Sequence, residues 1–471
     1  MSDRLEWWLR WRLSVLWALQ WGVTGAILTY LPLYFKQKGL SDGELGPLMA
    51  VSAVGLWVAP FVVGQICDRW LATEKYLAIA HFIGGLTLVV IPIATDIYID
   101  TQENFGVLVV LIGLYAAAYL PTIPLASSLS FRHLPDPDRQ FGKVRIWGTV
   151  GWVLAGLSLS LWLGRADVLR WLMEEFPAWK PTLVDLQTTF YWVAEPTSSD
   201  CFRIAALLSF ALSSFCVFLP STPPARSDRG VIAPLQALQM FRVPTFSLLI
   251  GTSFLLALVI PLYIYAVPNL LEQREFPADW VPAVMTIGQI SEFPALLLLA
   301  FCLKRYGLKS TFAIGMGAWF IRYLLFATSD SDWLILIAIG LHGVCHVFLI
   351  IVVQLYVHSQ CRSDVRASAQ NMFAFITMGI AMPVGFLLGG KLGEWCTDTS
   401  GTTNYHLFFA VPAGLLLMLL IAYCKWFRLL GKRRTDDPTT DASAVKPTAL
   451  GAGDDLQSED DPLIGDTELA I

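Results

Sequence analysis

Charged side chains are scarce in this chain of 471 residues. Only 15% of its residues are Asp, Glu, Lys or Arg, whereas 55% are hydrophobic, and the mean hydropathy is +0.59. A typical soluble protein carries about 25% charged residues. The shortage of charge therefore excludes a soluble protein of this length and predicts one that crosses the membrane several times. The formal net charge of -5 says little about partners, because much of the acid lies in one C-terminal tail.

Motifs for soluble catalysis are also missing. The loops hold few His, Cys or paired carboxylate residues, and no glycine-rich loop is suited to cradle a phosphate. The eight cysteines are scattered without the spacing of metal ligands, so we expect free thiols. No cleavable signal peptide is visible at the tryptophan-rich N-terminus. We expect no enzyme, no cofactor, no metal, no nucleic-acid partner and no ATP-driven pump, which leaves an ion gradient or simple equilibration as the energy source.

Long apolar runs organise the chain instead. Each of twelve runs is near the length that spans a bilayer as a helix. They cover residues 13–35, 45–66, 76–95, 105–128, 144–164, 201–219, 246–271, 280–303, 311–328, 333–357, 367–390 and 405–427. The sequence predicts an all-α membrane protein with twelve transmembrane helices.

Lys and Arg are divided unequally between the two sides of the predicted membrane. With both termini inside, the inner segments hold about three times as many basic residues as the outer loops. Two outer loops, 96–104 and 329–332, hold no basic residue at all. This asymmetry predicts a multi-pass protein of the cell (inner) membrane with both termini in the cytoplasm.

The runs fall into two groups of six. We expect an N-terminal half at 1–219, a cytoplasmic linker at 220–245, a C-terminal half at 246–430 and a disordered acidic tail at 431–471. The aromatic outer loop 165–200 fits either a surface helix on the bilayer or an insertion without a role. Short basic loops at 64–70 and 303–309 occupy matching places in the two halves, which is typical of transporters.

The loop at 64–70 resembles the signature loop of the major facilitator superfamily. Gly64, Asp68 and Arg69 match that pattern, whereas Trp70 and Leu71 stand where the pattern has glycine shortly after the arginine. The resemblance implies two six-helix halves that face each other across a central cavity.

One carboxylate lies in the middle of an apolar run. Glu292 interrupts residues 283–301, and Gln289 shares its helix face three residues earlier. An ionised carboxylate in hydrocarbon costs several kcal/mol, and such residues usually bind substrates or protons. The alternative is a structural hydrogen bond between packed helices. We expect a substrate and proton site at Glu292 with Gln289.

The fifth run carries polar groups on one helix face. Arg145, Thr149 and Trp152 are spaced four and three residues apart, which suits a polar ring compound bound by hydrogen bonds and stacking. The alternative is that Arg145 extends to the lipid headgroups. Gly148 and Gly151 allow close helix approach and favour the cavity-facing prediction.

Other polar residues inside the runs are lesser candidates. His342 and His346 lie one helical turn apart and are able to relay protons, as is His81, and we add His346 to Glu292 as a proton-coupling residue. Arg322 suits an interhelical structural role slightly better than a ligand role. The remaining candidates fit helix packing better than a site: Gln20, Tyr119, Thr122, Tyr263, Tyr265, Gln354 and Asn371.

The chain resembles the nucleoside/proton symporter family of the major facilitator superfamily. The matching stretches are residues 118–122, 144–151, 289–292, 305–309, 318–322 and 366–370, and the R-I-W-G-T and Q-I-S-E blocks are fairly specific together. The resemblance implies a proton-coupled importer of purine and pyrimidine nucleosides. It also implies that Arg145, Thr149, Gln289 and Glu292 line the substrate site.

The chain departs from that family pattern in its second half. The seventh run lacks a central amide residue, with Asn269 only towards its outer end, and Val347 beside His346 replaces an acidic residue. The ligand is therefore a nucleoside, a nucleobase or another hydroxylated ring compound. Two alternatives to a symporter stay open: a facilitator or exporter of another solute, and a membrane sensor of the same fold that does not transport.

The expected mechanism is symport by a monomer. Glu292 takes up a proton from outside, which removes the bare charge and allows the loaded carrier to reorient. It releases the proton to the cytoplasm, where the pH is higher. Arg145 orients the substrate or pairs with Glu292, and Trp152 stacks on the base.

Overall fold

Helices make up nearly all of the computed structural model, which describes residues 2–58, 63–189, 195–224, 244–360 and 372–436. The first group, called the N-half, comprises α1 (Ser2–Ile27), α2 (Leu31–Gln37), α3 (Asp42–Val51), α4 (Val54–Val58), α5 (Gly64–Arg69), α6 (Thr73–Thr101), α7 (Phe105–Tyr119), α8 (Thr122–His133), α9 (Pro137–Leu163), α10 (Arg165–Glu175), α11 (Lys180–Thr189) and α13 (Asp200–Phe215). The second group, called the C-half, comprises α15 (Pro244–Gln273), α16 (Val281–Ile290), α17 (Glu292–Thr328), α18 (Asp332–Gly340), α19 (His342–His346), α20 (Val352–Gln360), α22 (Met382–Cys396) and α23 (Tyr405–Asp436). Two π-helical stretches, η6 (Val347–Ile351) and η7 (Phe375–Ala381), interrupt the C-half.

The described helices agree with the predicted apolar runs. Ten spans are long and apolar enough to cross a membrane. One of them, Ala278–Thr328, holds two of the predicted runs, which are separated where Gly307 leaves helical geometry at φ 72°. The predicted run 45–66 includes residues 59–62, which lie outside the described part of the chain.

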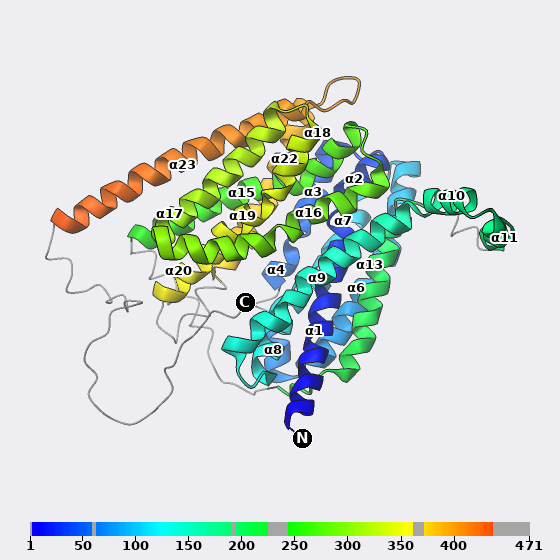
Figure 1. Ribbon diagram of the computed structural model, residues 1–471, viewed down its shortest axis with the longest axis horizontal. Coiled ribbons are helices and arrows are strands. Elements are labelled where there is room, and N and C mark those ends of the chain that lie inside the picture. Colours follow the sequence, from blue (N-terminus) through cyan, green and yellow to red (C-terminus); the bar gives the residue numbers. More distant parts are fainter. Residues whose placement is uncertain (1, 59–62, 190–194, 225–243, 361–371, 437–471) are drawn as a thin grey trace.

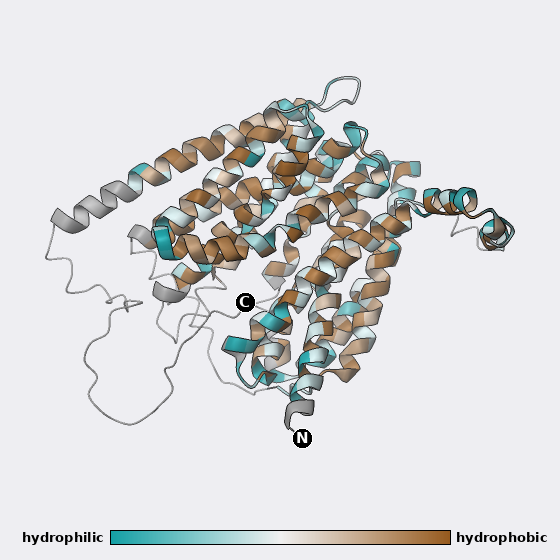
Figure 2. Ribbon diagram, viewed as in Figure 1, coloured by the Kyte–Doolittle hydropathy of each residue, from teal (hydrophilic) through white to brown (hydrophobic). Residues whose placement is uncertain are grey.

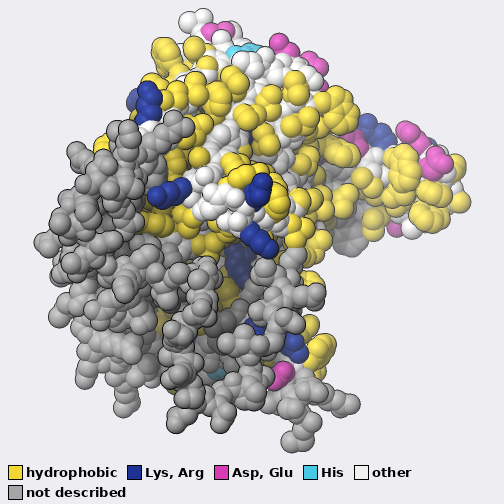
Figure 3. Space-filling view, turned by 60° about the vertical axis from the view of Figure 1, so that its left-hand side comes forward, with side chains coloured by type: hydrophobic (Ala, Val, Ile, Leu, Met, Phe, Trp, Pro, Cys, Tyr) yellow, Lys and Arg dark blue, Asp and Glu magenta, His cyan; other side chains and the backbone are white. Residues whose placement is uncertain are grey.

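Apolar side chains cover much of the described surface on the face drawn in Figure 3, and hydrophobic residues occur along most of the helices in Figure 2. Leu154 and Leu161 on α9 and Val110 on α7 are among the exposed large hydrophobic residues. Lipid solvates such side chains as well as a protein core does, so helices in a bilayer associate through close packing. Gly151 of α9 provides such a contact, since its backbone lies against Ala18 of α1.

The boundary between the two halves, called the seam, is tightly packed at one end of the bundle. This upper end lies opposite the start of α1 (Figure 1). There α3 packs on α22, and Gly390 allows the approach: a Cβ at this position would lie 2.9 Å from the Cα of Gly46. Nearby, α9 contacts α16, where the backbone N–H of Ala283 donates to the Ser160 hydroxyl over 2.9 Å.

Asp42 gathers polar contacts at the upper end. Its buried carboxylate forms an ion pair of 2.7 Å with Lys36 and accepts a hydrogen bond of 2.6 Å from the Tyr265 hydroxyl. The Thr397 hydroxyl donates to its other oxygen over 3.2 Å. Towards the other end the ribbons of the two halves diverge (Figure 1). The structure is therefore closed above the centre of the bundle.

Helices α10 and α11 form an arm that extends sideways from the upper end (Figure 1). A buried ion pair of 2.9 Å between Arg165 and Asp200 anchors its base. Trp171, Phe176 and Trp179 on the arm are exposed. Residues 165–189 therefore contain helices, as one of the two alternatives for this loop expects, whereas the outer position of the loop and its contact with the bilayer stay predictions. Most of the predicted linker and the tail beyond Asp436 lie outside the described residues.

The contact between α3 and α22 leads to a first prediction. Gly390→Leu places a side chain against the Gly46 backbone, so it separates the halves at the upper end. Spin labels on cysteines at Glu103 and Thr399, both exposed, report the distance between the halves when the native cysteines are replaced. We expect a longer distance in the variant. Gly414→Leu is the control, because a Cβ at Gly414 meets nothing within 4 Å; an unchanged distance in Gly390→Leu contradicts the packing described.

Candidate functional site

A break in the eighth predicted helix places Glu292. Helix α16 ends at Ile290, and α17 begins at Glu292 after one turn residue, Ser291, whose φ of −68° and ψ of −13° stay in the right-handed helical region. Pro294 contributes to the break because it has no N–H to donate to the preceding turn. The Ser291 hydroxyl donates to the Gly288 carbonyl over 2.6 Å and accepts the Gly343 N–H over 2.8 Å. Ser291 thereby joins the break to the start of α19.

Glycine at position 343 allows this junction. A Cβ there would lie 2.2 Å from the Ser291 carbonyl oxygen, so the two backbones are in direct contact. The preceding residue on α19 is His342, whose Nε2 consequently lies 3.7 Å from Glu292 Oε1. Both side chains remain partly exposed, at 15% for His342 and 21% for Glu292. His346 stacks on His342 one turn later, with 5.4 Å between ring centroids.

Arg322 lies on the Nδ1 side of the His342 ring and is fully buried. Its Nη1 is 3.2 Å from His342 Nδ1, and its guanidinium carbon lies 3.5 Å from the centre of the Tyr263 ring. The Arg322 Nε and Nη2 atoms have no hydrogen-bond partner among the described residues. A buried charge is thus held by one hydrogen bond and the face of an aromatic ring, which attracts cations.

The N-half contributes a second guanidinium. The Arg145 carbon lies 4.7 Å from the Trp17 ring and 4.6 Å from the Trp21 ring, and the Trp21 ring lies 5.7 Å from that of Trp152. Arg145 is close enough to Glu292 for the two charges to attract each other across the seam. This placement supports the cavity-facing prediction for Arg145 over its extension to the headgroups.

Three buried polar atoms near the seam lack partners within the described structure. They are the indole Nε1 atoms of Trp21 and Trp152 and the amide Oε1 of Gln289. Gly156 of α9 lies against Thr286 of α16. Trp152 lies one helical turn from Gly156 on α9, and Gln289 lies one turn from Thr286 on α16, in both helices on the side away from the upper end. Trp152 and Gln289 are therefore at a similar depth in the bundle. Unpaired buried donors and acceptors are costly, and they are expected where a polar ligand binds.

The other predicted residues divide between the site and the surrounding structure. Tyr263 belongs to the Arg322 cluster, and Thr149 is half-buried on the Arg145 face. Tyr265 binds Asp42 at the upper end and is remote from Glu292. Gln354 is exposed, and Asn371 lies outside the described residues.

Gln20, Tyr119, Thr122 and His81 form one buried network in the N-half. Gln20 donates to the Thr122 hydroxyl over 2.8 Å and contacts His81 Nε2 over 3.0 Å, and the Tyr119 hydroxyl donates to the Gln20 carbonyl. Since these groups satisfy one another, the network suits helix packing.

Trp17, Trp21 and Ser291 were not predicted as site residues. Trp17 and Trp21 share a face of α1 with Gln20 and Thr24, at spacings of three and four residues, and that pattern was the available signal. Nothing in the sequence marks Ser291 beyond its place in the Q-I-S-E block.

Glu292, His342 and His346 place their ligand atoms within 4.8 Å of one another, a spacing that a metal ion is able to span. The Arg322 contact opposes this use of His342. An arginine only donates, so His342 Nδ1 accepts and its hydrogen is on Nε2, which then has no lone pair for a metal. We therefore treat the cluster as a proton and hydrogen-bond site.

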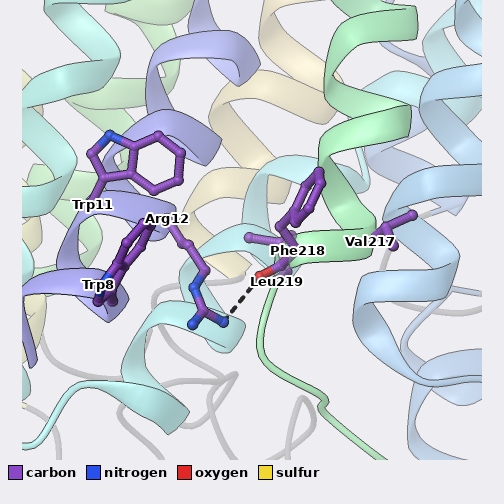
Figure 4. A pocket seen from close by; sticks show the side chains of 6 residues that line it. All are labelled: Trp8, Trp11, Arg12, Val217, Phe218 and Leu219. Atoms are coloured by element: carbon purple, nitrogen blue, oxygen red, sulfur yellow. Dashed lines mark hydrogen bonds between the residues drawn. The ribbon is translucent and has the colours of Figure 1, made fainter. Parts of the chain in front are cut away.

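Two pockets lie away from this cluster. One, of about 360 Å³, lies at the start of α1 between Trp8, Trp11 and the segment Val217–Leu219 (Figure 4). There the Arg12 guanidinium donates a hydrogen bond to the Phe218 carbonyl. The other, at the upper end, lies around Arg274 and His406. Neither includes Glu292 or Arg145.

The junction at Gly343 generates a stability prediction. Gly343→Ala drives a methyl group into the Ser291 carbonyl, and overpacking of this kind costs about 1–3 kcal/mol. We expect a melting temperature several degrees lower for the purified protein in detergent. Gly340→Ala, on the preceding helix turn, is the matched control, since its Cβ would meet Ile287 at an ordinary 3.8 Å. Equal melting temperatures for the two variants would show that the backbones are not in contact.

Comparison with known proteins agrees with this geometry. The family model described as "Nucleoside H+ symporter" matches residues 8–173 and 186–431. The putative nucleoside transporter YegT of Escherichia coli is 29% identical over 435 residues, which cover 88% of this chain and 93% of YegT. The nucleoside permease NupG of Escherichia coli is 27% identical over 444 residues, 89% of this chain and 96% of NupG.

Solved structures show the same fold. The crystal structure of NupG superposes with a TM-score of 0.73 at 25% identity, covering 89% of this chain and 99% of NupG. A D-xylose–proton symporter superposes with a TM-score of 0.61 at 14% identity, covering 86% of this chain and 95% of the symporter, which concerns the fold alone. The relatives are transporters and not enzymes, and the architecture is the major facilitator fold. This multi-pass membrane protein belongs to the nucleoside–proton symporter family.

Proposed function

We propose that this protein imports nucleosides together with protons by alternating access, as a monomer in the inner membrane with both termini in the cytoplasm. The observation that carries the proposal is the meeting of complementary groups at the seam. Arg145, Trp21 and Trp152 come from the N-half, and Gln289 and Glu292 come from the C-half. A ligand bound between them contacts both halves, which is the requirement for a carrier that rocks around a central site.

The chemistry of these groups suits a nucleoside. The indoles of Trp21 and Trp152 offer flat faces for a base and N–H donors for its carbonyl or ring nitrogen atoms. The unpaired Gln289 oxygen is an acceptor for a ribose hydroxyl or an amino group. Arg145 adds donors in a fixed plane. The names of the relatives YegT and NupG, both described as nucleoside transporters, support this substrate class.

Glu292 is the proposed proton carrier. In the empty carrier its negative charge is compensated by Arg145 across the seam. A proton taken up from outside neutralises Glu292 and releases Arg145 for the substrate, so the halves are free to reorient. In the orientation proposed, the closed upper end faces outwards, and this packing supports an inward-facing state. His346, partly exposed one turn beyond His342, is placed to pass the proton towards Glu292.

The direct experiment is uptake of labelled uridine and adenosine by cells that express the protein, with and without a protonophore. Accumulation that collapses with the protonophore is the expected result. Uptake that only equilibrates would identify a facilitator, and substrate binding without uptake would identify a sensor. Either result would overturn the symport proposal.

The Glu292→Gln variant tests whether proton coupling is lost while nucleoside binding and exchange are kept. The amide keeps the size and polarity of the side chain but does not titrate, so accumulation against a gradient should fall by about tenfold or more. Exchange of labelled for unlabelled nucleoside should continue, because it needs no net proton movement. Glu394→Gln, an exposed carboxylate paired with Lys391, is the control. Full accumulation by Glu292→Gln would exclude Glu292 as the carrier.

Arg145→Lys tests the guanidinium. Lysine keeps the charge but loses the flat surface that lies against Trp17 and Trp21, an interaction of about 1 kcal/mol per ring. We expect the KM for nucleoside to rise about tenfold. Arg139→Lys, at an exposed position on the same helix, should leave KM unchanged. An unchanged KM in Arg145→Lys would place the substrate elsewhere.

A further inference from the structure

We infer that Arg322 is a positioning residue that fixes His342 as a neutral hydrogen-bond donor towards Glu292, so that His342 does not carry the transported proton. The inference rests on the proposed proton role of Glu292. It assigns different tasks to two histidines that the sequence places side by side.

The first step concerns the direction of one hydrogen bond. Arg322 Nη1 lies 3.2 Å from His342 Nδ1. A guanidinium has only N–H donors and no acceptor, so Nδ1 must supply the lone pair. A neutral imidazole with a lone pair on Nδ1 carries its hydrogen on Nε2. The contact therefore selects one tautomer of His342.

The second step follows the ring to its other nitrogen. His342 Nε2 lies 3.7 Å from Glu292 Oε1, a little beyond the distance of a normal hydrogen bond. Such contacts are often long in a substrate-free site and shorten during the working cycle. The N–H thus points towards the carboxyl group that exchanges the proton.

The third step excludes a second proton on His342. That proton would have to occupy Nδ1, directly against the Arg322 guanidinium, and two like charges at this distance repel strongly in a buried place. The other groups facing the ring do not remove the repulsion. Tyr263 from α15 stacks on it, α16 presents Gly288, and His346 stacks from the same helix. The carboxylate of Glu292, 3.7 Å from Nε2, attracts a charged ring, but it does not restore the hydrogen bond from Arg322 that a proton on Nδ1 removes.

The fourth step is that Arg322 has no alternative position. It is fully buried, its charge lies on the Tyr263 ring, and the ring of Trp319 is 5.8 Å from it. Its one hydrogen bond within the described structure goes to His342. His346 differs, because no hydrogen bond to its side chain occurs among the described residues and it is half-buried. No such hydrogen bond selects one tautomer of His346.

Glutamine at position 342 provides the decisive test. Its amide oxygen is able to accept from Arg322 and its amide N–H to donate to Glu292, but the group does not titrate. Accumulation of labelled nucleoside by His342→Gln should stay within about twofold of wild type, with the same dependence on external pH. His342→Leu, which neither accepts nor donates, should lose about tenfold or more. A tenfold loss in His342→Gln would show that His342 titrates during transport and would overturn the inference.

Removal of Arg322 gives the complementary result. In Arg322→Leu the Nδ1 atom is free, so His342 titrates and the pH profile of uptake should gain an additional transition near the ordinary histidine range of about pH 6.5. Arg322→Leu combined with His342→Gln should lose that transition. A profile of Arg322→Leu that keeps the wild-type shape would reduce Arg322 to a packing residue and overturn the inference. His406→Gln, an exposed histidine at the upper end and away from Glu292, serves as the matched control and should keep the wild-type profile.

A measurement without transport separates this inference from the proposed function. The ring nitrogen shifts of isotopically labelled histidine in the purified protein report the tautomer, and the His342 signal is assigned by its loss in His342→Gln. We expect a hydrogen on Nε2 and none on Nδ1 from about pH 5 to about pH 8. A doubly protonated His342 in this range would overturn the inference. Failure of nucleoside accumulation with the expected tautomer present would overturn only the proposed function.

Discussion

Lipid offers no hydrogen bonds, so every charge in the centre of this bundle must be compensated by another side chain. Three charged side chains meet there: Arg145, Glu292 and Arg322. Arg145 is held between indole rings in the N-half, and Arg322 is held by Tyr263 and His342 in the C-half. Among the described residues, Glu292 is the carboxylate that lies near both guanidinium groups, and it is therefore the proposed site where protonation changes the charge balance.

The fold was largely predictable from the sequence. The length and apolarity of the runs define the membrane helices, because the thickness of the bilayer sets both quantities. Glu292 and Arg145 were also predictable as candidate site residues, since a charge at such a depth needs a reason. The lesser candidate Tyr265 shows the limit of this reasoning: a tyrosine in a membrane helix has the same sequence signature whether it faces the centre or closes the upper end at Asp42.

The details of the site could not be predicted, because they depend on contacts between residues far apart in the chain. Ser291 accepts the N–H of Gly343, 52 residues later, and only the folded structure shows that this contact places His342 beside Glu292. The tautomer of His342 depends in turn on Arg322, which sequence reasoning assigned to helix packing. Trp17 and Trp21 were missed because aromatic residues are ordinary in membrane helices, and their role comes from the guanidinium they enclose.

The junction between Ser291 and Gly343 has a consequence for energy conversion. It lies wholly within the C-half, as do Glu292, His342 and Arg322, so the proposed proton carrier and the two residues that position it travel together as the halves rock. The proposed substrate groups are divided between the halves, and the attraction between Arg145 and Glu292 is the described electrostatic link across the seam. Coupling is thus a property of the seam and not of either half. A change that widens the seam at the centre would turn the carrier into a proton leak while leaving each half intact.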